Sequence, residues 1–211
     1  MVQIRAGGQG PYTLEGRVAV VTGGSGGIGA ATAKRLAAAG ARVVVGYNNG
    51  RDRADAVLKE LAGESHLALR IPMEDSLAIA AAAETVREKF GHTDVLINSA
   101  GVTRAVAHAD LDGLDDATFD RILITNVRGP FSTLRSFAKL LRAAGDSIVV
   151  NLSSISGTTG LGSSIAYCAS KAALDTIGLS LARVLGPILA GITQLRLTTG
   201  STIVVDSGRH L

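Results

Sequence analysis

The feature that most constrains the fold of this chain is a regular alternation of short β-branched runs with longer alanine-rich stretches. Short runs of this kind are typical of buried strands, and the longer stretches are typical of helices. The predicted strands cover residues 17–22, 42–46, 66–71, 94–98, 147–152 and 202–206. The predicted helices cover residues 27–39, 51–62, 76–90, 115–144 and 164–185. This alternation predicts βαβ units, and therefore a doubly wound parallel sheet in a three-layer α/β/α fold.

Size and composition favour a single domain. The chain has 211 residues and is 46% hydrophobic, which suits one compact α/β unit with a sizeable core. Residues 1–13 are rich in glycine and polar residues and lack the apolar core of a signal peptide, so we expect a flexible N-terminal arm there. Residues 14–211 are expected to form the domain, with its longest helix bent near Gly129 and Pro130 because proline removes a backbone donor.

Composition also argues against several classes of function. The formal net charge is +3, but the basic residues are scattered rather than gathered into a patch, and aromatic residues make up only 3%. Both observations argue against a nucleic-acid partner. No apolar run approaches the length needed to span a bilayer, which argues against a membrane protein. The single cysteine, Cys168, excludes an intrachain disulfide and predicts a reducing, cytoplasmic location.

The C-terminal part departs from the expected pattern. After Pro187 the chain passes through residues 188–192 almost directly to the last predicted strand. A doubly wound sheet normally places a further strand and a substrate-covering segment there, and too few residues remain for a strand with its crossover. We therefore expect that such a segment is missing after Pro187. Either the protein lacks it, or the natural chain is longer and the missing residues form a strand and a mobile substrate lid.

A glycine-rich loop follows the first predicted strand. The string TGGSGGIG occupies residues 22–29 and opens the first predicted helix. Glycines let the backbone turn tightly and approach a pyrophosphate, while the helix N-terminus presents free N–H groups to it. Because the string joins a strand to a helix, it predicts a dinucleotide site in a Rossmann-like fold rather than a merely flexible turn. The expected contacts are Gly23, Ser25, Gly27, Ile28 and Gly29.

The ends of the second and fourth predicted strands complete this site. No acid follows the second strand until Asp52, whereas Arg51 and Arg53 stand close to it. A 2′-phosphate prefers arginine without an acid, so the sequence favours NADP(H) over NAD(H); the same arginines also suit the solvated start of a helix. The fourth strand ends in a turn of small residues, against which a cofactor can lie. The further expected cofactor contacts are Tyr47, Asn48, Asn98, Ala100 and Gly101.

Three side chains near the fifth strand form the most specific pattern. Tyr167 and Lys171 are four residues apart, so they lie on one face of a predicted helix, and Ser154 stands in the loop before it. A free tyrosine has a pKa of about 10 and is a poor base at neutral pH, but a nearby lysine cation stabilises tyrosinate. The group therefore suits general acid–base chemistry. Cys168 points elsewhere on the helix and is interpreted as a packing residue.

Together these motifs resemble the classical short-chain dehydrogenase/reductase family, most closely its 3-oxoacyl-[acyl-carrier-protein] reductase-like members. The family's T-G-x-x-x-G-x-G motif matches the loop at 22–29, and its N-N-A-G turn matches residues 98–101 with Ser99 as a departure. Its helix asparagine matches Asn126, and its Ser–Tyr–Lys set matches the three residues above. The resemblance covers residues 14–186 and resumes at Leu197.

The resemblance implies an NAD(P)(H)-dependent oxidoreductase that transfers a hydride between nicotinamide and a carbonyl or alcohol carbon, with 3-oxoacyl thioesters as one candidate substrate class. In the family, the serine that matches Ser154 polarises the substrate oxygen, and the tyrosine that matches Tyr167 transfers the proton. The residue that matches Lys171 binds the nicotinamide ribose, and the main chain at Asn126 holds a relay water. A homotetramer built through helices 115–144 and 164–185 is also implied, with no metal.

Two departures and two alternatives stand beside this interpretation. Gly26 occupies a position where many NADP-using relatives carry arginine. Pro72 occupies a position where the family often has an acid that binds adenine, and the nearby Asp75 is offset from that position. A catalytically degraded dinucleotide-binding or interaction protein of the same fold is the main alternative, because of the gap after Pro187. Nucleotide-sugar epimerases and dehydratases share Tyr-x-x-x-Lys but usually carry a larger C-terminal substrate domain.

Overall fold

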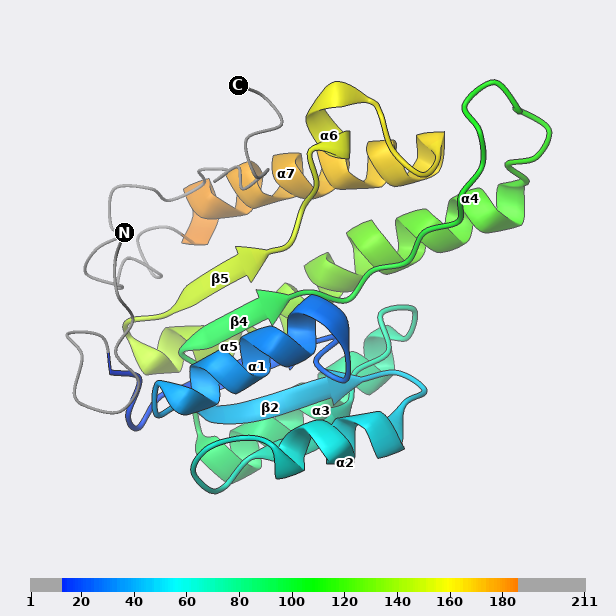
Figure 1. Ribbon diagram of the computed structural model, residues 1–211. Coiled ribbons are helices and arrows are strands. Elements are labelled where there is room, and N and C mark those ends of the chain that lie inside the picture. The colour runs from blue at the N-terminus through cyan, green and yellow to red at the C-terminus, as the bar shows by residue number, and fades with distance from the viewer. Residues whose placement is uncertain (1–12, 186–211) are drawn as a thin grey trace, which may run out of the picture.

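The computed structural model of the chain describes residues 13–185, and these form a three-layer α/β/α unit (Figure 1). Its middle layer is a parallel sheet with strand order β3-β2-β1-β4-β5. The strands are β1 Val18–Thr22, β2 Arg42–Tyr47, β3 Leu67–Arg70, β4 Val95–Asn98 and β5 Ile148–Asn151. The helices are α1 Gly27–Ala38, α2 Arg51–Lys59, α3 Ser76–Phe90, α4 Asp116–Leu123, η1 Ile124–Arg128, α5 Gly129–Ala144, α6 Ser156–Thr159 and α7 Ile165–Leu185. The predicted doubly wound fold is confirmed for the described residues.

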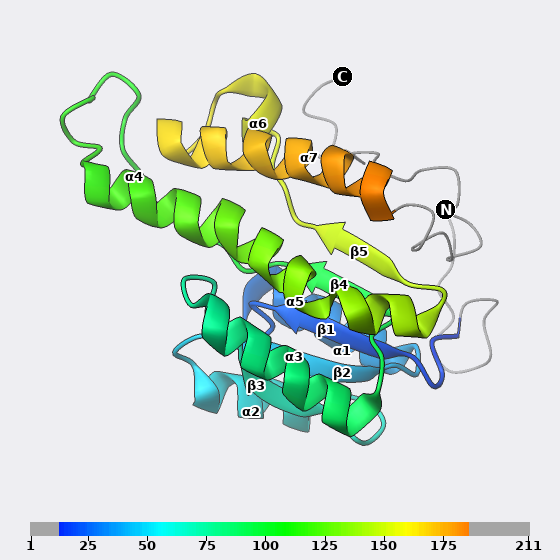
Figure 2. The same cartoon turned by 180° about the vertical axis from the view of Figure 1, so that it is seen from behind.

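Two apolar layers hold the helices to the sheet. Helices α1 and α2 cover one face, where Ala19 and Val21 of β1 point, and α3 and α5 cover the other, where Val20 points (Figures 1 and 2). All of these β1 side chains are fully buried. A strand buried on both faces reads as a continuous apolar run, which is why the sequence predicted it readily. The alanines on the inner face of α1 allow close approach of the helix to the sheet.

The long helix predicted for 115–144 is interrupted where expected, but in a different form. Helix α4 passes into η1, a π-helical turn, before α5 begins at Gly129. The backbone N–H of Gly129 bonds the carbonyl of Ile124, five residues back. Pro130 then lies in the first turn of α5, where a missing amide hydrogen costs little. The proline therefore marks the junction between a π turn and a new α-helical segment.

Other differences are local. Helix α2 ends at Lys59 rather than at residue 62, and the short helix α6 was not predicted. The predicted strand at 202–206 and the gap after Pro187 lie outside the described residues, and so do residues 1–12 of the predicted arm. Asp75, which the sequence left unassigned, is the N-cap of α3, because its carboxylate accepts hydrogen bonds from the backbone of Leu77 and Ala78.

Gly129 is the point of closest approach between α5 and the β3–α3 connection. A Cβ atom at Gly129 would lie 2.6 Å from the Cβ of Met73 and 3.0 Å from its carbonyl oxygen. We predict that Gly129→Ala lowers the free energy of unfolding by about 1–3 kcal/mol, because the helix must shift to admit the methyl group. Urea denaturation followed by circular dichroism measures the change.

The matched control is Gly178→Ala in α7, where the added Cβ would meet, within the described part of the chain, only Asn151 Nδ2, at 3.6 Å. This substitution should stabilise the protein by up to about 1 kcal/mol, because alanine has the higher helix propensity. Equal stability of the two variants would contradict the assigned contact.

Candidate active site

The glycine-rich loop lies at the carboxyl-terminal edge of the sheet and packs against the ends of two neighbouring strands. Gly23 has a positive φ of 66°, and a Cβ there would lie 2.9 Å from the Cα of Ala100. Gly24 N donates to the carbonyl of Gly46, 2.8 Å away. The next part of the loop is open to solvent, with Ile28 69% exposed. Helix α1 has Gly26 as its N-cap and no side-chain cap, which suits anion binding by its first amides.

The two arginines singled out in the sequence follow the end of β2 and lie in the first turn of α2. Arg51 Nε bonds both carboxylate oxygens of Asp55, at 2.9 and 2.8 Å, and its guanidinium lies 5.9 Å from the centroid of the Tyr47 ring. The hydrogen bond to Asp55 raises the pKa of Arg51. Arg53 folds back over Gly50, whose added Cβ would lie 2.6 Å from the guanidinium carbon. Both cations therefore stand in the first turn of α2, beside predicted contacts Tyr47 and Asn48.

The turn after β4 is tied to the strands on either side. Thr22 Oγ1 accepts hydrogen bonds from the backbone amides of Ser99 and Ala100, each at 3.2 Å. Asn98 Nδ2 donates to Asn151 Oδ1 of β5 at 2.9 Å, while Asn98 Oδ1 is buried without a donor among the described residues. The departure at Ser99 leaves this turn intact, because the backbone amide of residue 99 is the group that binds.

Asn126 joins the turn after β4 to helix α7. Its Oδ1 accepts from the amide of Val102 at 2.8 Å, and its Nδ2 donates to the Val102 carbonyl at 2.9 Å and to Ser170 Oγ at 3.0 Å. Ser170 Oγ donates in turn to the carbonyl of Tyr167 at 2.7 Å. Both amide hydrogens and the oxygen of the Asn126 side chain are thus hydrogen-bonded within the protein. Its own carbonyl has no α-helical donor four residues on, since that position is Pro130.

Lys171 lies at the centre of the site. It is 7% exposed, its Nζ donates to the carbonyl of Leu152 at 2.7 Å, and it lies 5.6 Å from the centroid of the Tyr167 ring. A Cβ added at Gly101 would be 3.9 Å from this Nζ and 3.3 Å from Asn126 Oδ1. Burial lowers the pKa of Lys171, and the carboxylate of Asp175 partly opposes that change. Gly101, Asn126, Tyr167 and Lys171 are therefore brought together.

Ser154 reaches α7 through the short helix α6. Its Oγ hydrogen-bonds Ser156 Oγ at 3.1 Å, and the hydroxyl of the preceding Ser153 donates to the Lys171 carbonyl at 3.3 Å. A Cβ at Gly157 would lie 2.8 Å from the amide of Ala172, so α6 packs directly on the α7 backbone. The contacts join Ser154 to the same stretch of α7 that carries Lys171, although no direct bond links Ser154 to Tyr167.

Sequence reasoning missed the hydroxyl groups that support the site. Thr22, Ser156 and Ser170 each bond a predicted site residue or its neighbour, and all three are buried. Ser170, directly before Lys171 on the same helix, was the one most open to detection. A serine inside a helix usually bonds its own backbone, however, so its pattern alone does not show a tertiary partner.

Residues 13–185 contain neither a cluster of metal-binding side chains nor a membrane-spanning helix. No cluster of three or more His, Cys, Asp or Glu side chains with the geometry of a metal site is found within this range. Among the described helices, none has the length and hydropathy of a membrane span.

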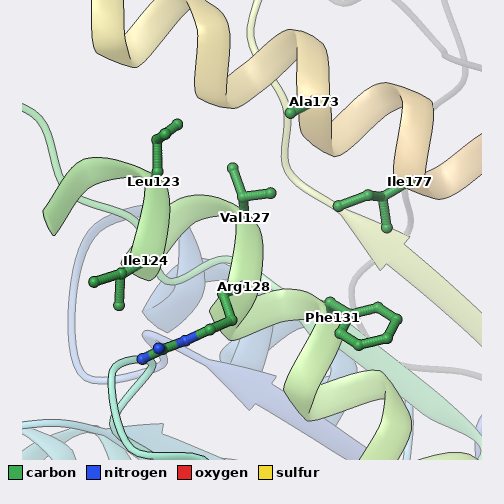
Figure 3. A pocket seen from close by; sticks show the side chains of 7 residues that line it. All are labelled: Leu123, Ile124, Val127, Arg128, Phe131, Ala173 and Ile177. Atoms are coloured by element: carbon green, nitrogen blue, oxygen red, sulfur yellow. The ribbon is translucent and has the colours of Figure 1, made fainter. Parts of the chain in front are cut away.

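An apolar groove of about 440 Å³ lies between α7 and the continuous helix formed by α4, η1 and α5 (Figure 3). None of the residues that line it is a predicted site residue. Its lining is Leu123, Ile124, Val127, Arg128, Phe131, Ala173 and Ile177.

A family model described as short chain dehydrogenase matches residues 17–200. D-threitol dehydrogenase of Mycolicibacterium smegmatis is 37% identical over 171 residues, which are 80% of this chain and 64% of that protein. "Granaticin polyketide synthase putative ketoacyl reductase 2" of Streptomyces violaceoruber is 39% identical over 203 residues, covering 93% of this chain and 81% of that protein. This chain therefore spans less than two thirds of the threitol dehydrogenase.

Solved structures give the same relationship. A short chain dehydrogenase from Burkholderia cenocepacia, crystallised in complex with NADP, has a TM-score of 0.73 and 39% sequence identity. The similarity covers 83% of this chain and 71% of the other.

Proposed function

The chain belongs to the short-chain dehydrogenase family of NAD(P)-dependent oxidoreductases, and we propose that it transfers a hydride between nicotinamide and a carbonyl or alcohol carbon of a small molecule. The observation that carries the proposal is the meeting of Asn126, Tyr167 and Lys171 at the carboxyl-terminal edge of the sheet, beside the glycine loop. The 3-oxoacyl thioesters are the first substrates to test, because a relative named as a ketoacyl reductase matches 93% of this chain.

The residues of the nucleotide site fit a dinucleotide. The first turn of α1 has no side-chain cap, so its amides are available to a pyrophosphate. The lack of a side chain at Gly23 lets the loop pack closely against Ala100. The buried Asn98 Oδ1 lacks a donor among the described residues, as expected of a group that a bound molecule or water completes. Nicotinamide, when bound, supplies or accepts the hydride. We assign its ribose to Lys171, whose Nζ is held beside the Tyr167 ring.

The acid–base work is assigned to Tyr167. Its hydroxyl gives a proton to the substrate oxygen in reduction, and its phenolate takes a proton from that oxygen in oxidation. The Lys171 ammonium stabilises the phenolate that this transfer leaves behind. Ser154 polarises the same substrate oxygen by donating a hydrogen bond to it. The Asn126 carbonyl, without a donor from Pro130, is assigned to hold the relay water that resupplies the proton.

The preference for NADP(H) is a finer proposal. It is supported by the two cations in the first turn of α2 and by the lack of an acid before Asp52. The Asp55 carboxylate competes for Arg51, but the pair is exposed to solvent, which screens its attraction. A phosphate dianion is therefore able to replace it. The predicted cytoplasmic location stays a prediction.

We also propose that α4, α5 and α7 form a subunit interface, in a homotetramer as the family resemblance implies. The groove between them is apolar (Figure 3). On these helices the Phe131 and Leu179 side chains are 38% and 49% exposed. A second copy that supplied matching helices would cover this surface.

The catalytic assignment predicts that Tyr167→Phe lowers kcat by at least about 100-fold, because it deletes the proton-transferring hydroxyl and retains the packed ring. Nucleotide affinity should change little. Oxidation of NADPH by a ketone panel that includes 3-oxoacyl thioesters gives kcat, and the change in NADPH fluorescence on binding gives Kd. Undiminished turnover would overturn the assignment. Tight nucleotide binding without any turnover of the wild type would instead favour the catalytically degraded alternative.

For cofactor choice, the wild type is expected to bind NADPH more tightly than NADH. Arg51→Ala should weaken NADPH about tenfold and leave NADH unchanged, and Tyr47→Asp should shift preference toward NADH by repelling the 2′-phosphate. Fluorescence titration of each variant with both nucleotides measures the effect. Lys59→Ala, at the other end of α2, is the control for loss of a positive charge and should change neither affinity. Tighter binding of NADH by the wild type would reverse the proposal.

For the interface, Phe131→Asp is expected to split the oligomer into smaller species, because it places a charge in the apolar groove. Light scattering after gel filtration measures the mass. The control is Leu111→Asp, which also replaces an exposed apolar residue with aspartate. Leu111 lies in the loop before α4, outside the proposed interface, so the mass should not change. A monomeric wild type, or equal behaviour of the two variants, would refute the interface.

A further inference from the structure

We infer that Ser156 is a positioning residue that holds and orients the hydroxyl of Ser154 during the reaction. This inference rests on the function proposed above, in which Ser154 donates a hydrogen bond to the substrate oxygen. No role for Ser156 follows from the sequence motifs that carry the family resemblance, so the structure is the source of the assignment.

Ser154 and Ser156 are joined by two hydrogen bonds. The backbone amide of Ser156 donates to Ser154 Oγ at 3.2 Å, and the two hydroxyl oxygens are 3.1 Å apart. Ser154 is half-buried, whereas Ser156 is only 6% exposed. The pair therefore has one member at the site and the other beneath it, away from water. Among the described contacts, Ser156 provides both hydrogen-bond partners of the Ser154 hydroxyl.

Ser156 is itself held firmly. A Cβ at Gly162 would lie 2.7 Å from Ser156 Oγ and 3.0 Å from Cys168 Sγ, so the loop before α7 closes tightly over this hydroxyl. On the other side, Gly157 brings α6 against the α7 backbone, where an added Cβ would be 2.9 Å from the carbonyl carbon of Lys171. The support of Ser154 is thus anchored to the helix that carries Tyr167 and Lys171.

The chemistry of a hydroxyl explains what this support does. A serine oxygen has one proton and two lone pairs, and the Ser156 amide occupies one lone pair of Ser154. Before substrate binds, the Ser154 proton can point to Ser156 Oγ. When the Ser154 proton turns to a substrate oxygen, the Ser156 hydroxyl can rotate and donate to the second lone pair. Neither hydroxyl loses its partner, and two donors to the Ser154 oxygen make its proton a stronger donor.

A double-mutant cycle tests the inference in the full-length protein. We expect Ser156→Ala to lower kcat about tenfold, the rate equivalent of one net hydrogen bond, without a matching change in nucleotide Kd. Ser154→Ala should lower kcat more, by about 100-fold. In the Ser154→Ala background, the added Ser156→Ala change should have no further effect, because Ser156 acts only through Ser154. Ser156→Cys, which retains a weak donor, should give an intermediate rate.

The matched control is Thr158→Ala, which removes an exposed hydroxyl from the same helix. Thr158 Oγ1 donates to the carbonyl of Ile155 at 3.0 Å and has no bond to Ser154, so kcat should not change. An unchanged kcat in Ser156→Ala overturns the inference. An equal loss of kcat when Ser156→Ala is added to the wild type and to Ser154→Ala also overturns it, because that result would show a merely structural effect. Wild-type turnover is measured first: its absence with every ketone overturns the proposed function together with this inference.

Discussion

The site depends on one amide side chain. Asn126 uses both of its amide hydrogens and its oxygen within the protein, and its partners are Val102 and Ser170. These bonds hold the turn after β4 against α7 at the place where η1 interrupts the long helix. Buried polar groups that lose a partner cost about 1–3 kcal/mol each, so alternative arrangements are disfavoured.

A second polar contact holds the opposite edge of the sheet. The buried carboxylate of Asp94 accepts hydrogen bonds from Arg17 Nη1 and from the amide of Val18, both at 2.7 Å, and lies 3.1 Å from His92 Nε2. Arg17 also donates to the carbonyl of Asp146 just before β5, at 2.8 Å. A buried carboxylate is tolerated only when its oxygens are paired in this way. The contacts fix the strands at their amino-terminal ends, which leaves the carboxyl-terminal edge free for ligands.

Much of this architecture could be predicted because its signals are local. Apolar runs predicted the strands of the sheet, and a proline marked the junction of η1 and α5. The dinucleotide loop was predictable for the same reason, since its glycines stand between a strand and a helix. The form of the break, a π turn, was not predictable, because a proline marks where a helix is interrupted but does not specify the hydrogen-bond pattern of the interruption. The role of Ser170 was hidden because its partner, Asn126, lies on another element, and that of Ser156 because sequence spacing does not show which way a hydroxyl points.

Leu152 links the pairing of β5 with β4 to the position of Lys171. The amide of this residue bonds the carbonyl of Asn98, and its own carbonyl receives Lys171 Nζ. Leu152 therefore connects strand pairing, through its amide, to the ammonium group beside Tyr167, through its carbonyl. A slip of β5 by a single residue would displace that carbonyl by about 3.3 Å, more than the length of the bond it makes. The position of the Lys171 ammonium group therefore depends on the register in which β5 pairs with β4.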